Sequence, residues 1–539
     1  MKIVRIGDGP TEQQPAEAIG AKAANLAHMA ALGLPVPPAF VLPVELCGAV
    51  IAGHADAERH LAEGLKEGIA FLEEATGKRF GDRRRPLLVS VRSGAARSMP
   101  GMLDTVLDVG CTAAAVRGLI RMTGNPRFAW DCRQRFLEGY ATVVAGGSPA
   151  PFAARLRGIT AAEGASSERE LDGAALEQLA GDYRSIVGDE NLSEDPMEHL
   201  TNAARAVYRS WMSERAQTYR RLEHLDDLQG TAVTVQAMVF GNRGRSSGAG
   251  VAFSRDPSTG AAQPVIEVLF DAQGEDVVSG RNTPQTEAAL AQALPDVATE
   301  LRRILAQLER EFRDVQDIEF TIEDSRLFIL QTRAAKRTPR AALRIAIDLV
   351  REGLITPAEA LRRLDGIDLD ALTRQRLRAP TDPVARGIGA SGVAVGRAAF
   401  DSTSAQRLAA AGDPVILLRP DTSTADVAGF AVSAGIVTAV GGCTAHAALV
   451  ARQMGKPCVA GCDRLTFDAS CQHAQIGTTA IEPGQWIAID GDSGDLYPGR
   501  QEIATERPDA ELAEVDRWRA ASKGRPASRA PGAAAAQLS

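Results

Sequence analysis

The sequence contains no run of 18 apolar residues, the length a helix needs to cross a membrane. It shows no N-terminal leader pattern either, because Met1–Arg5 runs directly into polar residues. An excess of basic residues is also missing, since 60 Lys and Arg stand against 68 Asp and Glu, a net charge of −8. These absences argue against a membrane protein and a nucleic-acid binder. We therefore expect a cytoplasmic protein that holds any anionic ligand with local groups.

Cysteine usage and nucleotide motifs exclude further classes. The seven cysteines are odd in number and have no paired short spacings, which argues against a disulfide framework. The spacing from Cys443 to His446 fits half of a zinc site, but no second ligand pair lies nearby. The chain has no Walker A loop and no protein-kinase signatures. At 539 residues it is long enough for two to four domains.

The stretch around His446 carries the strongest chemical signal. Residues 441–446 read Gly-Gly-Cys-Thr-Ala-His and lead into an apolar helical run that Gly455 would end. Thr444 is placed to cap that helix, so we expect His446 in its first turn. The helix dipole and unpaired N–H groups there disfavour imidazolium and favour a bound anion, which suits a neutral nucleophile. An ordinary hydrogen-bonded histidine is the alternative.

Lys22 is a second candidate. It stands in the first turn of a helix that the pattern predicts from Gly20 to Gly33. A cation there is unfavourable unless an anion lies close, although a solvated lysine fits the local pattern equally well.

A predicted strand and the loop after it form a third candidate. The apolar strand Leu87–Val91 runs into a loop of small residues that begins at Arg92. Backbone N–H groups and the guanidinium could hold phosphate there. A flexible surface loop is the alternative.

Two carboxylates mark a fourth candidate. Residues 316–323 alternate between apolar and polar, and a second apolar strand follows a polar turn at residues 324–325. Asp317 and Glu319 therefore project from one face of a strand and could hold Mg²⁺ against a polyphosphate. A solvent-facing acidic strand is the alternative.

Taken together, these stretches resemble the pyruvate phosphate dikinase family of phosphoenolpyruvate-utilising enzymes. The similarity lies in GGCTAHAALVARQMGKPCVAG, in the Lys22 helix with LGLPVPPAF, in VRSGAARSMPGMLDTVLDVG, and in DIEFTIE followed by LQTR. It extends over about residues 20–500. Cys443 and Ala445 depart from the methionine and serine usual in the family run, which leaves the carrier histidine itself in place.

The resemblance implies roles for individual residues. His446 would be the phosphohistidine, with Lys22 and Arg92 as catalytic groups. The implied ATP contacts are Lys22, Arg92, Ser93, Gly94, Gly101, Asp317, Glu319, Gln331 and Arg333. The implied Mg²⁺ ligands are Asp317, Glu319 and Gln331. Thr444 would be a candidate for regulatory phosphorylation.

Strand register sets a condition on this site. With a two-residue turn and regular pairing, Gln331 and Arg333 would face away from Asp317 and Glu319. A shared site therefore requires a β-bulge or a loop of odd length.

The resemblance predicts an α/β and α+β multidomain fold. We expect an ATP-grasp nucleotide-binding module, a helical connector, a swivelling β/β/α phosphohistidine carrier domain and a largely disordered tail. Their expected ranges are 1–340 (with a helical insert at about 111–230), 341–385, 386–500 and 501–539.

The implied reaction is phosphorylation of His446 with ATP and inorganic phosphate, giving AMP and pyrophosphate, and transfer to or from pyruvate or phosphoenolpyruvate. A (β/α)₈ barrel for the latter needs roughly 250 residues, and 39 follow Arg500. We therefore expect a separate barrel protein as partner and only the ATP-side half reaction from this chain. A different acceptor and a nucleotide-binding regulatory pseudoenzyme are the alternatives, and the sequence does not exclude a homodimer.

Overall fold

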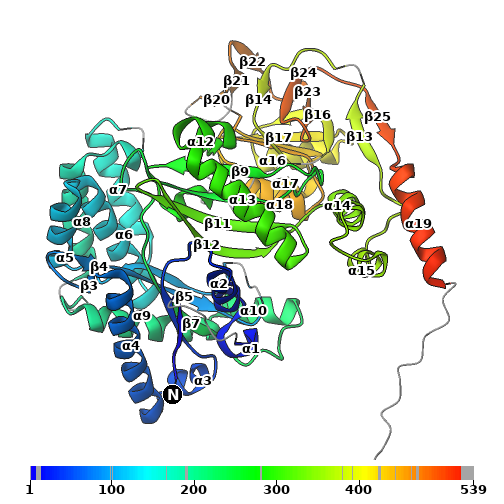
Figure 1. Ribbon diagram of the computed structural model, residues 1–539. Helices are drawn as coiled ribbons and strands as arrows, with labels where there is room; N and C mark the ends of the chain where they lie inside the picture. Colours follow the sequence, from blue (N-terminus) through cyan, green and yellow to red (C-terminus); the bar gives the residue numbers. More distant parts are fainter. Residues whose placement is uncertain are drawn as a thin grey trace, which may run out of the picture. The chain divides into compact units, whose positions relative to one another are not determined.

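The structure, a computed structural model, shows a mixed α/β protein that divides into two compact units (Figure 1). It describes residues 2–7, 14–97, 99, 101–165, 167–188, 192–278, 282–378, 380–390, 392–422, 426–442, 445–462, 464–468 and 473–523. The first unit comprises residues 1–249, 270–273 and 318–333, and the second comprises the remainder. Within the described ranges, no helix has both the length and the apolar character to span a membrane.

An antiparallel sheet of five strands forms the centre of the first unit. Its order is β1 (Val4–Ile6), β2 (Ala39–Leu42), β7 (Ala232–Ala237), β5 (Val89–Gly94) and β6 (Thr105–Val109). Side chains alternate between the two faces, and one face contributes Val89, Val91 and Val235 to the apolar core. The opposite face carries Arg92, which pairs directly with Thr234. One face of this sheet is thus apolar, and the other carries polar side chains on β5 and β7 beside the buried apolar Val41 of β2.

Helices surround this sheet, and α9 packs against β5, β6 and β7. They are α1 (Ala16–Ile19), α2 (Ala21–Ala31), α3 (Leu46–Ile51), α4 (Ala55–Thr76), α5 (Ala113–Thr123), α6 (Pro126–Gly139), α7 (Ala150–Ala162), α8 (Gly173–Val187), α9 (Pro196–Arg209) and α10 (Glu214–Leu222). The predicted helix after Gly20 is confirmed as α2. Figure 1 shows α5, α6, α7 and α8 gathered on one side of the first unit.

A second five-stranded sheet has the order β10, β9, β8, β11, β12. Its strands are β8 (Gly248–Phe253), β9 (Val265–Phe270), β10 (Gln285–Thr286), β11 (Gln316–Glu323) and β12 (Arg326–Ala334), and the helices of this region are α11 (Gly274–Val278), α12 (Glu287–Ala293) and α13 (Pro295–Phe312). The division between the units cuts through β8, β9, β11 and β12 of this sheet. The hairpin β11–β12 matches the sequence prediction. Its turn consists of Asp324 and Ser325, which have φ values of 49° and 62°, the positive values of a type I′ turn.

Strand β12 changes phase in its second half. The N–H of Ile329 donates to the Pro35 carbonyl at 2.8 Å and so points away from β11. Backbone groups of successive residues in a regular strand point to alternate sides, so the carbonyl of Thr332, three residues later, would point toward β11. Instead that carbonyl accepts from the Asn25 side chain at 2.9 Å. The change marks a β-bulge between Ile329 and Thr332. This bulge meets the condition that a shared site imposed on the hairpin.

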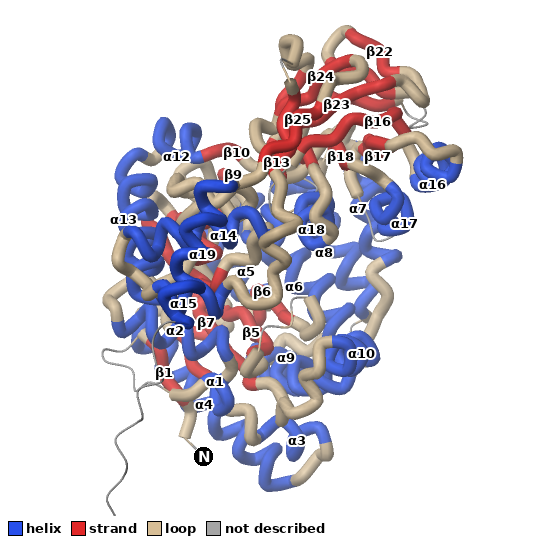
Figure 2. The backbone as a smooth tube through the Cα atoms, turned by 90° about the vertical axis from the view of Figure 1, so that its right-hand side faces the viewer, coloured by secondary structure: helices blue, strands red, loops and turns tan. Residues whose placement is uncertain are grey.

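The second unit contains an eight-stranded sheet with parallel strands at its centre, whose strands lie together in Figure 2. Its order is β14 (Ala385–Arg386), β24 (Asp495–Pro498), β23 (Trp486–Asp490), β16 (Val393–Ala399), β17 (Val415–Arg419), β18 (Gly435–Thr438), β19 (Cys458–Ala460) and β15 (Ile388–Ala390). Helices α16 (Ser402–Ala410), α17 (Val427–Val432) and α18 (His446–Gln453) connect the parallel strands, and β20 (Leu465–Phe467), β21 (Ala474–Ile476) and β22 (Thr479–Ile481) form a small sheet. The buried residues Ala447, Ala448 and Ala451 fix α18 against the sheet.

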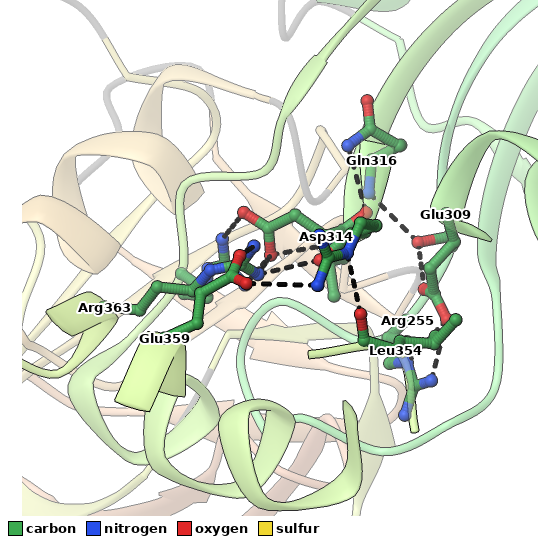
Figure 3. A network of polar contacts seen from close by, with 11 residues as sticks. Arg255, Glu309, Asp314, Gln316, Leu354, Glu359 and Arg363 are labelled. Carbon is green, nitrogen blue, oxygen red and sulfur yellow. Dashed lines mark hydrogen bonds and ion pairs between the residues drawn. The ribbon is translucent and has the colours of Figure 1, made fainter. Parts of the chain in front are cut away.

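The network in Figure 3 ties the ends of helices α14 (Pro339–Arg351) and α15 (Pro357–Arg363) to α13 and to the segment between α13 and β11. Arg255 binds Glu309 at 2.7 Å and Glu352 at 2.5 Å. Arg363 donates to Glu359 and lies 3.5 Å from Asp314. These contacts hold the connector helices as part of the second unit.

The charged segment 509–518 of the expected tail, for which the sequence allows a helix, is helical, and a strand precedes it. Residues in the expected tail form β25 (Ile503–Glu506), which pairs with β13 (Arg374–Leu377), and α19 (Asp509–Lys523). Leu512 and Val515 of α19 are buried in the core that α14 and α15 share. Apolar burial thus orders this segment, while residues 524–539 lie outside the described residues.

Candidate functional site

A pocket of about 60 Å³ in the first unit brings together three stretches that are far apart in the sequence. It is lined by Ala21, Lys22, Asn25, Ser93, Gly94, Ala95, Arg97, Met99, Leu103, Gln331, Thr332 and Arg333. Five of the expected ATP contacts are on this lining: Lys22, Ser93, Gly94, Gln331 and Arg333. Arg92, Gly101 and Glu319 do not line the pocket itself. Its size suits a phosphoryl group or a few water molecules rather than a whole nucleotide.

Close backbone packing fixes the position of Lys22. A Cβ atom on Gly20, whose φ is 81°, would lie only 2.2 Å from the carbonyl oxygen of Gly94. The N–H of Ala21 donates to the Ala95 carbonyl at 2.9 Å. The start of α2 is therefore held against the end of β5, and the glycine at position 20 is required because any side chain would collide.

Asn25 attaches the same helix to β12. Its side chain donates to the Thr332 carbonyl at the bulge, and it lies one turn after Lys22. The sequence analysis did not identify Asn25. Its i+3 spacing from Lys22, which places both side chains on one helix face, was the available signal.

Cationic groups outnumber carboxylates around Lys22. Burial is the main cause that lowers the pKa of Lys22; Glu319 raises this pKa, and Arg92 and Arg333 lower it. The side chain retains exposed surface, while its ammonium lies in a region dense with protein atoms. Burial also lowers the pKa of Arg92, against an opposing effect of Glu319. Among the groups that act on Lys22, two arginines repel its ammonium and Glu319 attracts it, and an anionic ligand would add to that attraction.

The structure corrects the expected phosphate loop. Arg92, Ser93 and Gly94 are not in a loop but are the last residues of β5. The N–H of Gly94 donates to the Thr231 hydroxyl at 3.0 Å, so it is not available to a phosphate. Strand pairing continues past the apolar run because β7 offers partners as far as Ala232. The guanidinium of Arg92 thus projects from a rigid strand.

Glu319 and Gln331 are in contact, as a shared site requires. The Gln331 amide donates to Glu319 at 3.4 Å, and Glu319 is half-buried. Asp317 is buried, with 7% of its surface exposed, and belongs to the second unit. Its role stays a prediction from the sequence.

The side-chain oxygens of Glu319 and Gln331 suit Mg²⁺, which takes several ligands from phosphate and water, better than they suit a metal ion that is coordinated by protein side chains alone. Among the described residues, no three His, Cys, Asp or Glu side chains are grouped to hold a metal. Mg²⁺ usually binds one or two carboxylates and takes its remaining ligands from phosphates and water. A single accessible carboxylate beside a cationic pocket matches that pattern.

The predicted helix at His446 is confirmed, with a correction to its cap. Helix α18 begins at His446, and the N-cap residue is Ala445 rather than Thr444. Cys443, Thr444 and the His446 side chain lie outside the described part of the structure. Helix α18 ends at Gln453, shortly before Gly455, whose φ is 64°.

The loop before α18 packs closely against β9 and the segment before β10, all within the second unit. A Cβ atom on Gly442 would lie 2.5 Å from Pro284 and 2.6 Å from Glu267. A Cβ atom on Gly461 would lie 2.9 Å from Thr283. The absence of side chains at these two positions permits the contact.

Comparison with known families identifies the chain. The family described as pyruvate phosphate dikinase, AMP/ATP-binding domain, matches residues 54–297 and 285–353. The PEP-utilising enzyme, mobile domain, matches residues 411–494. The chain belongs to the pyruvate phosphate dikinase family.

Individual relatives carry the same name. The pyruvate, phosphate dikinase of Clostridium symbiosum is 40% identical over 490 residues, which cover 89% of this chain and 56% of the relative. That of Rhizobium meliloti (strain 1021) is 40% identical over 542 residues, 97% of this chain and 60% of the relative. The chloroplastic pyruvate, phosphate dikinase 1 of Arabidopsis thaliana is 40% identical, covering 93% and 53%. The chain therefore spans between half and two thirds of the length of these relatives.

A solved NMR structure of an Enzyme I protein is 17% identical, with a TM-score of 0.13, and covers 33% of this chain and 59% of that one. The chloroplastic relative leaves the cytoplasmic location a prediction.

Proposed function

We propose that this chain is a dikinase-type phosphotransferase that binds ATP with Mg²⁺ and becomes phosphorylated on His446. The observation that carries the proposal is the cluster of Lys22, Arg92 and Arg333 beside Glu319. Such a cluster suits a polyphosphate, and it disfavours a pseudoenzyme that has lost its phosphate contacts. Membership in the dikinase family supports the same function.

In the proposed mechanism, the cations position and neutralise the phosphates. Lys22 and Arg333 line the pocket, and Arg92 adds charge from the end of β5. Glu319, with Asp317 and Gln331 as the further candidates from the sequence, would hold Mg²⁺. When bound, this ion neutralises phosphate charge. Positioning and electrostatic stabilisation of this kind account for most of the rate enhancement in phosphoryl transfer.

His446 is proposed as the nucleophile. One imidazole nitrogen forms a bond to the β-phosphorus of ATP, and the bond from that phosphorus to the oxygen of the α-phosphate breaks, releasing AMP. Inorganic phosphate then takes the terminal phosphoryl group, which releases pyrophosphate and leaves phosphohistidine. The position of His446 at the start of α18 favours the neutral, nucleophilic form of its imidazole.

An ATP-grasp module and a swivelling carrier domain are the architecture we propose for this reaction, with the domain borders expected from the sequence. The Gly442 loop contacts Glu267 and Pro284 within the second unit, and this contact would help to position the carrier domain. Pyruvate and phosphoenolpyruvate are the proposed acceptor pair. The comparisons lend no support to a separate barrel protein, because the relatives are longer dikinases of which this chain matches a part.

Mass spectrometry of the protein incubated with ATP, Mg²⁺ and phosphate tests the proposal. We expect one acid-labile phosphoryl group, absent from His446→Asn. His473→Asn is a matched control, since His473 is an exposed histidine that contacts Asp468 at 3.2 Å. No labelling of the wild type, or labelling of His446→Asn, would refute the proposal.

A further inference from the structure

The polar face of the first sheet holds a buried hydroxyl that the proposed function does not use. Thr234 lies on β7, directly across from Arg92 on β5 and from Val41 on β2. It is 5% exposed. Within the described residues, neither its Oγ1 nor the adjacent Nε of Arg92 has a hydrogen-bond partner. Two residues that are paired across neighbouring strands in the middle of a sheet thus each carry an unsatisfied polar atom.

Such an arrangement is costly unless a ligand completes it. Burying a hydroxyl without a partner is unfavourable, and valine would fill the same volume at no such cost. The next residues on β7, Val233 and Val235, are valines that face the apolar core. Gln236, on the same face as Thr234, has its partner in the Pro37 carbonyl at 3.2 Å. Thr234 thus stands out as an unsatisfied group on an otherwise satisfied strand.

The position of Thr234 points to the ligand of Arg92. Residues paired across antiparallel strands have Cα atoms about 4.5–5.5 Å apart and side chains on one face. Both side chains therefore project from the same face of the sheet, where the Thr234 hydroxyl and the Arg92 Nε–H would donate to an anion bound at that face. Arg92 is already within electrostatic reach of Lys22 and Glu319.

We infer that Thr234 is an additional substrate-binding residue, whose hydroxyl donates a hydrogen bond to a phosphate oxygen of the nucleotide held by Arg92 and Lys22. This inference rests on the proposed function. It assigns β7, as well as β5 and β12, to the nucleotide site.

The test measures ATP affinity and thermal stability in three variants. Thr234→Val should weaken ATP binding by about three- to tenfold, the effect of one lost hydrogen bond. Without nucleotide its melting temperature should equal or exceed that of the wild type, because the unsatisfied hydroxyl is gone. Thr234→Ser, which keeps the hydroxyl, should bind ATP nearly as well as the wild type. Thr201→Val is the control, since Thr201 donates to the Met197 carbonyl within α9.

Each other outcome overturns the inference. Unchanged ATP affinity in Thr234→Val would show that the hydroxyl does not contact the nucleotide. A lower melting temperature of ligand-free Thr234→Val would show that the hydroxyl has a structural partner, such as an internal water. If the wild type itself fails to bind ATP, the proposed function fails, and the inference fails with it.

Discussion

The Gln331 amide reaches Glu319 across a hairpin whose two-residue turn would, with regular pairing, place these side chains on opposite faces. The bulge in β12 corrects the register by one residue. The same bulge exposes the Thr332 carbonyl to Asn25 and so attaches α2. One irregularity in an edge strand therefore brings a carboxylate, an amide and the Lys22 helix to one site.

Loss of the Gln331 amide should impair the proposed reaction. Gln331→Leu leaves Glu319 without this donor, so the carboxylate is less precisely oriented toward the metal and nucleotide. We expect the rate of His446 labelling by ATP to fall by about tenfold, the upper range for one hydrogen bond. The measurement is quenched-flow labelling with radioactive ATP. Gln307→Leu, at a half-buried position on α13 where the Gln307 side chain accepts from Arg303, should leave the rate unchanged. Equal rates in all three proteins would contradict the assignment.

Elements with a strong local pattern were predictable from the sequence. The alternation of Ile318, Phe320 and Ile322 gave β11, and these residues are buried. Thr356 before a proline gave the start of α15, where its hydroxyl accepts from the Glu359 N–H. In each of these cases the signal is confined to neighbouring residues, which fix it through side-chain alternation or capping.

Features that depend on distant partners were not predictable. Small residues made Ser93 and Gly94 look like a loop, but pairing with β7 keeps them in a strand. The cap of α18 fell on Ala445, one residue after the threonine that the pattern favoured. The bulge depends on Asn25 and Pro35, which are about 300 residues away in the sequence. Tertiary contacts of this kind override local propensity.

ATP binding should be coupled to proton uptake at alkaline pH. Burial and the neighbouring arginines lower the pKa of Lys22 in the free protein, and a bound polyphosphate would raise it. Between the two pKa values, the complex holds a proton that the free protein has lost. Calorimetry of ATP binding in buffers of different ionisation enthalpy should therefore show that the complex takes up protons at pH values below the ordinary pKa of lysine.

Lys22→Met provides the control for this coupling and should abolish it. In the wild type without nucleotide, the unfolded chain binds more protons than the folded chain over the same pH window, so stability should rise with pH there. The variant should lose this rise while remaining folded. Proton uptake that persists in Lys22→Met would assign the effect to another group.

A methyl group on Gly442 should block the proposed docking of the carrier loop. In Gly442→Ala the added Cβ would meet Pro284 and Glu267 at distances that no real contact adopts. Overpacking of this kind costs about 1–3 kcal/mol, so labelling of His446 should slow by about tenfold or more. Gly158→Ala, on α7 with open space around its Cα, should label at the wild-type rate.

A double-mutant cycle identifies the partner in this contact. Glu267→Ala removes the carboxylate that the new methyl group meets, so combining it with Gly442→Ala should restore part of the rate. Additive effects of the two substitutions would mean that the loop and β9 act independently during labelling.

The ion pair between Arg340 and Asp492 should help to hold the proposed carrier domain against α14 within the second unit. Arg340 lies on α14 and Asp492 in the turn after β23, and their side chains meet at 2.9 Å with 25% and 16% of their surfaces exposed. The second oxygen of Asp492 accepts from the Gly392 N–H at 3.1 Å, so the carboxylate is held in place before it meets the arginine. This preorganisation reduces the entropy lost on pairing, which makes the contact worth more than an ordinary surface pair.

Arg340→Met should therefore lower the rate of His446 labelling by about three- to tenfold. ATP affinity should stay unchanged, because we assign Arg340 to docking of the carrier and not to nucleotide binding. Arg344→Met is the matched control, since Arg344 lies one turn along the same helix and pairs with Asp348 of that helix, at 3.8 Å. High salt should slow the wild type toward the rate of Arg340→Met, because screening weakens the pair. If Arg340→Met changes ATP affinity instead of the labelling rate, the pair supports the nucleotide site and not the carrier.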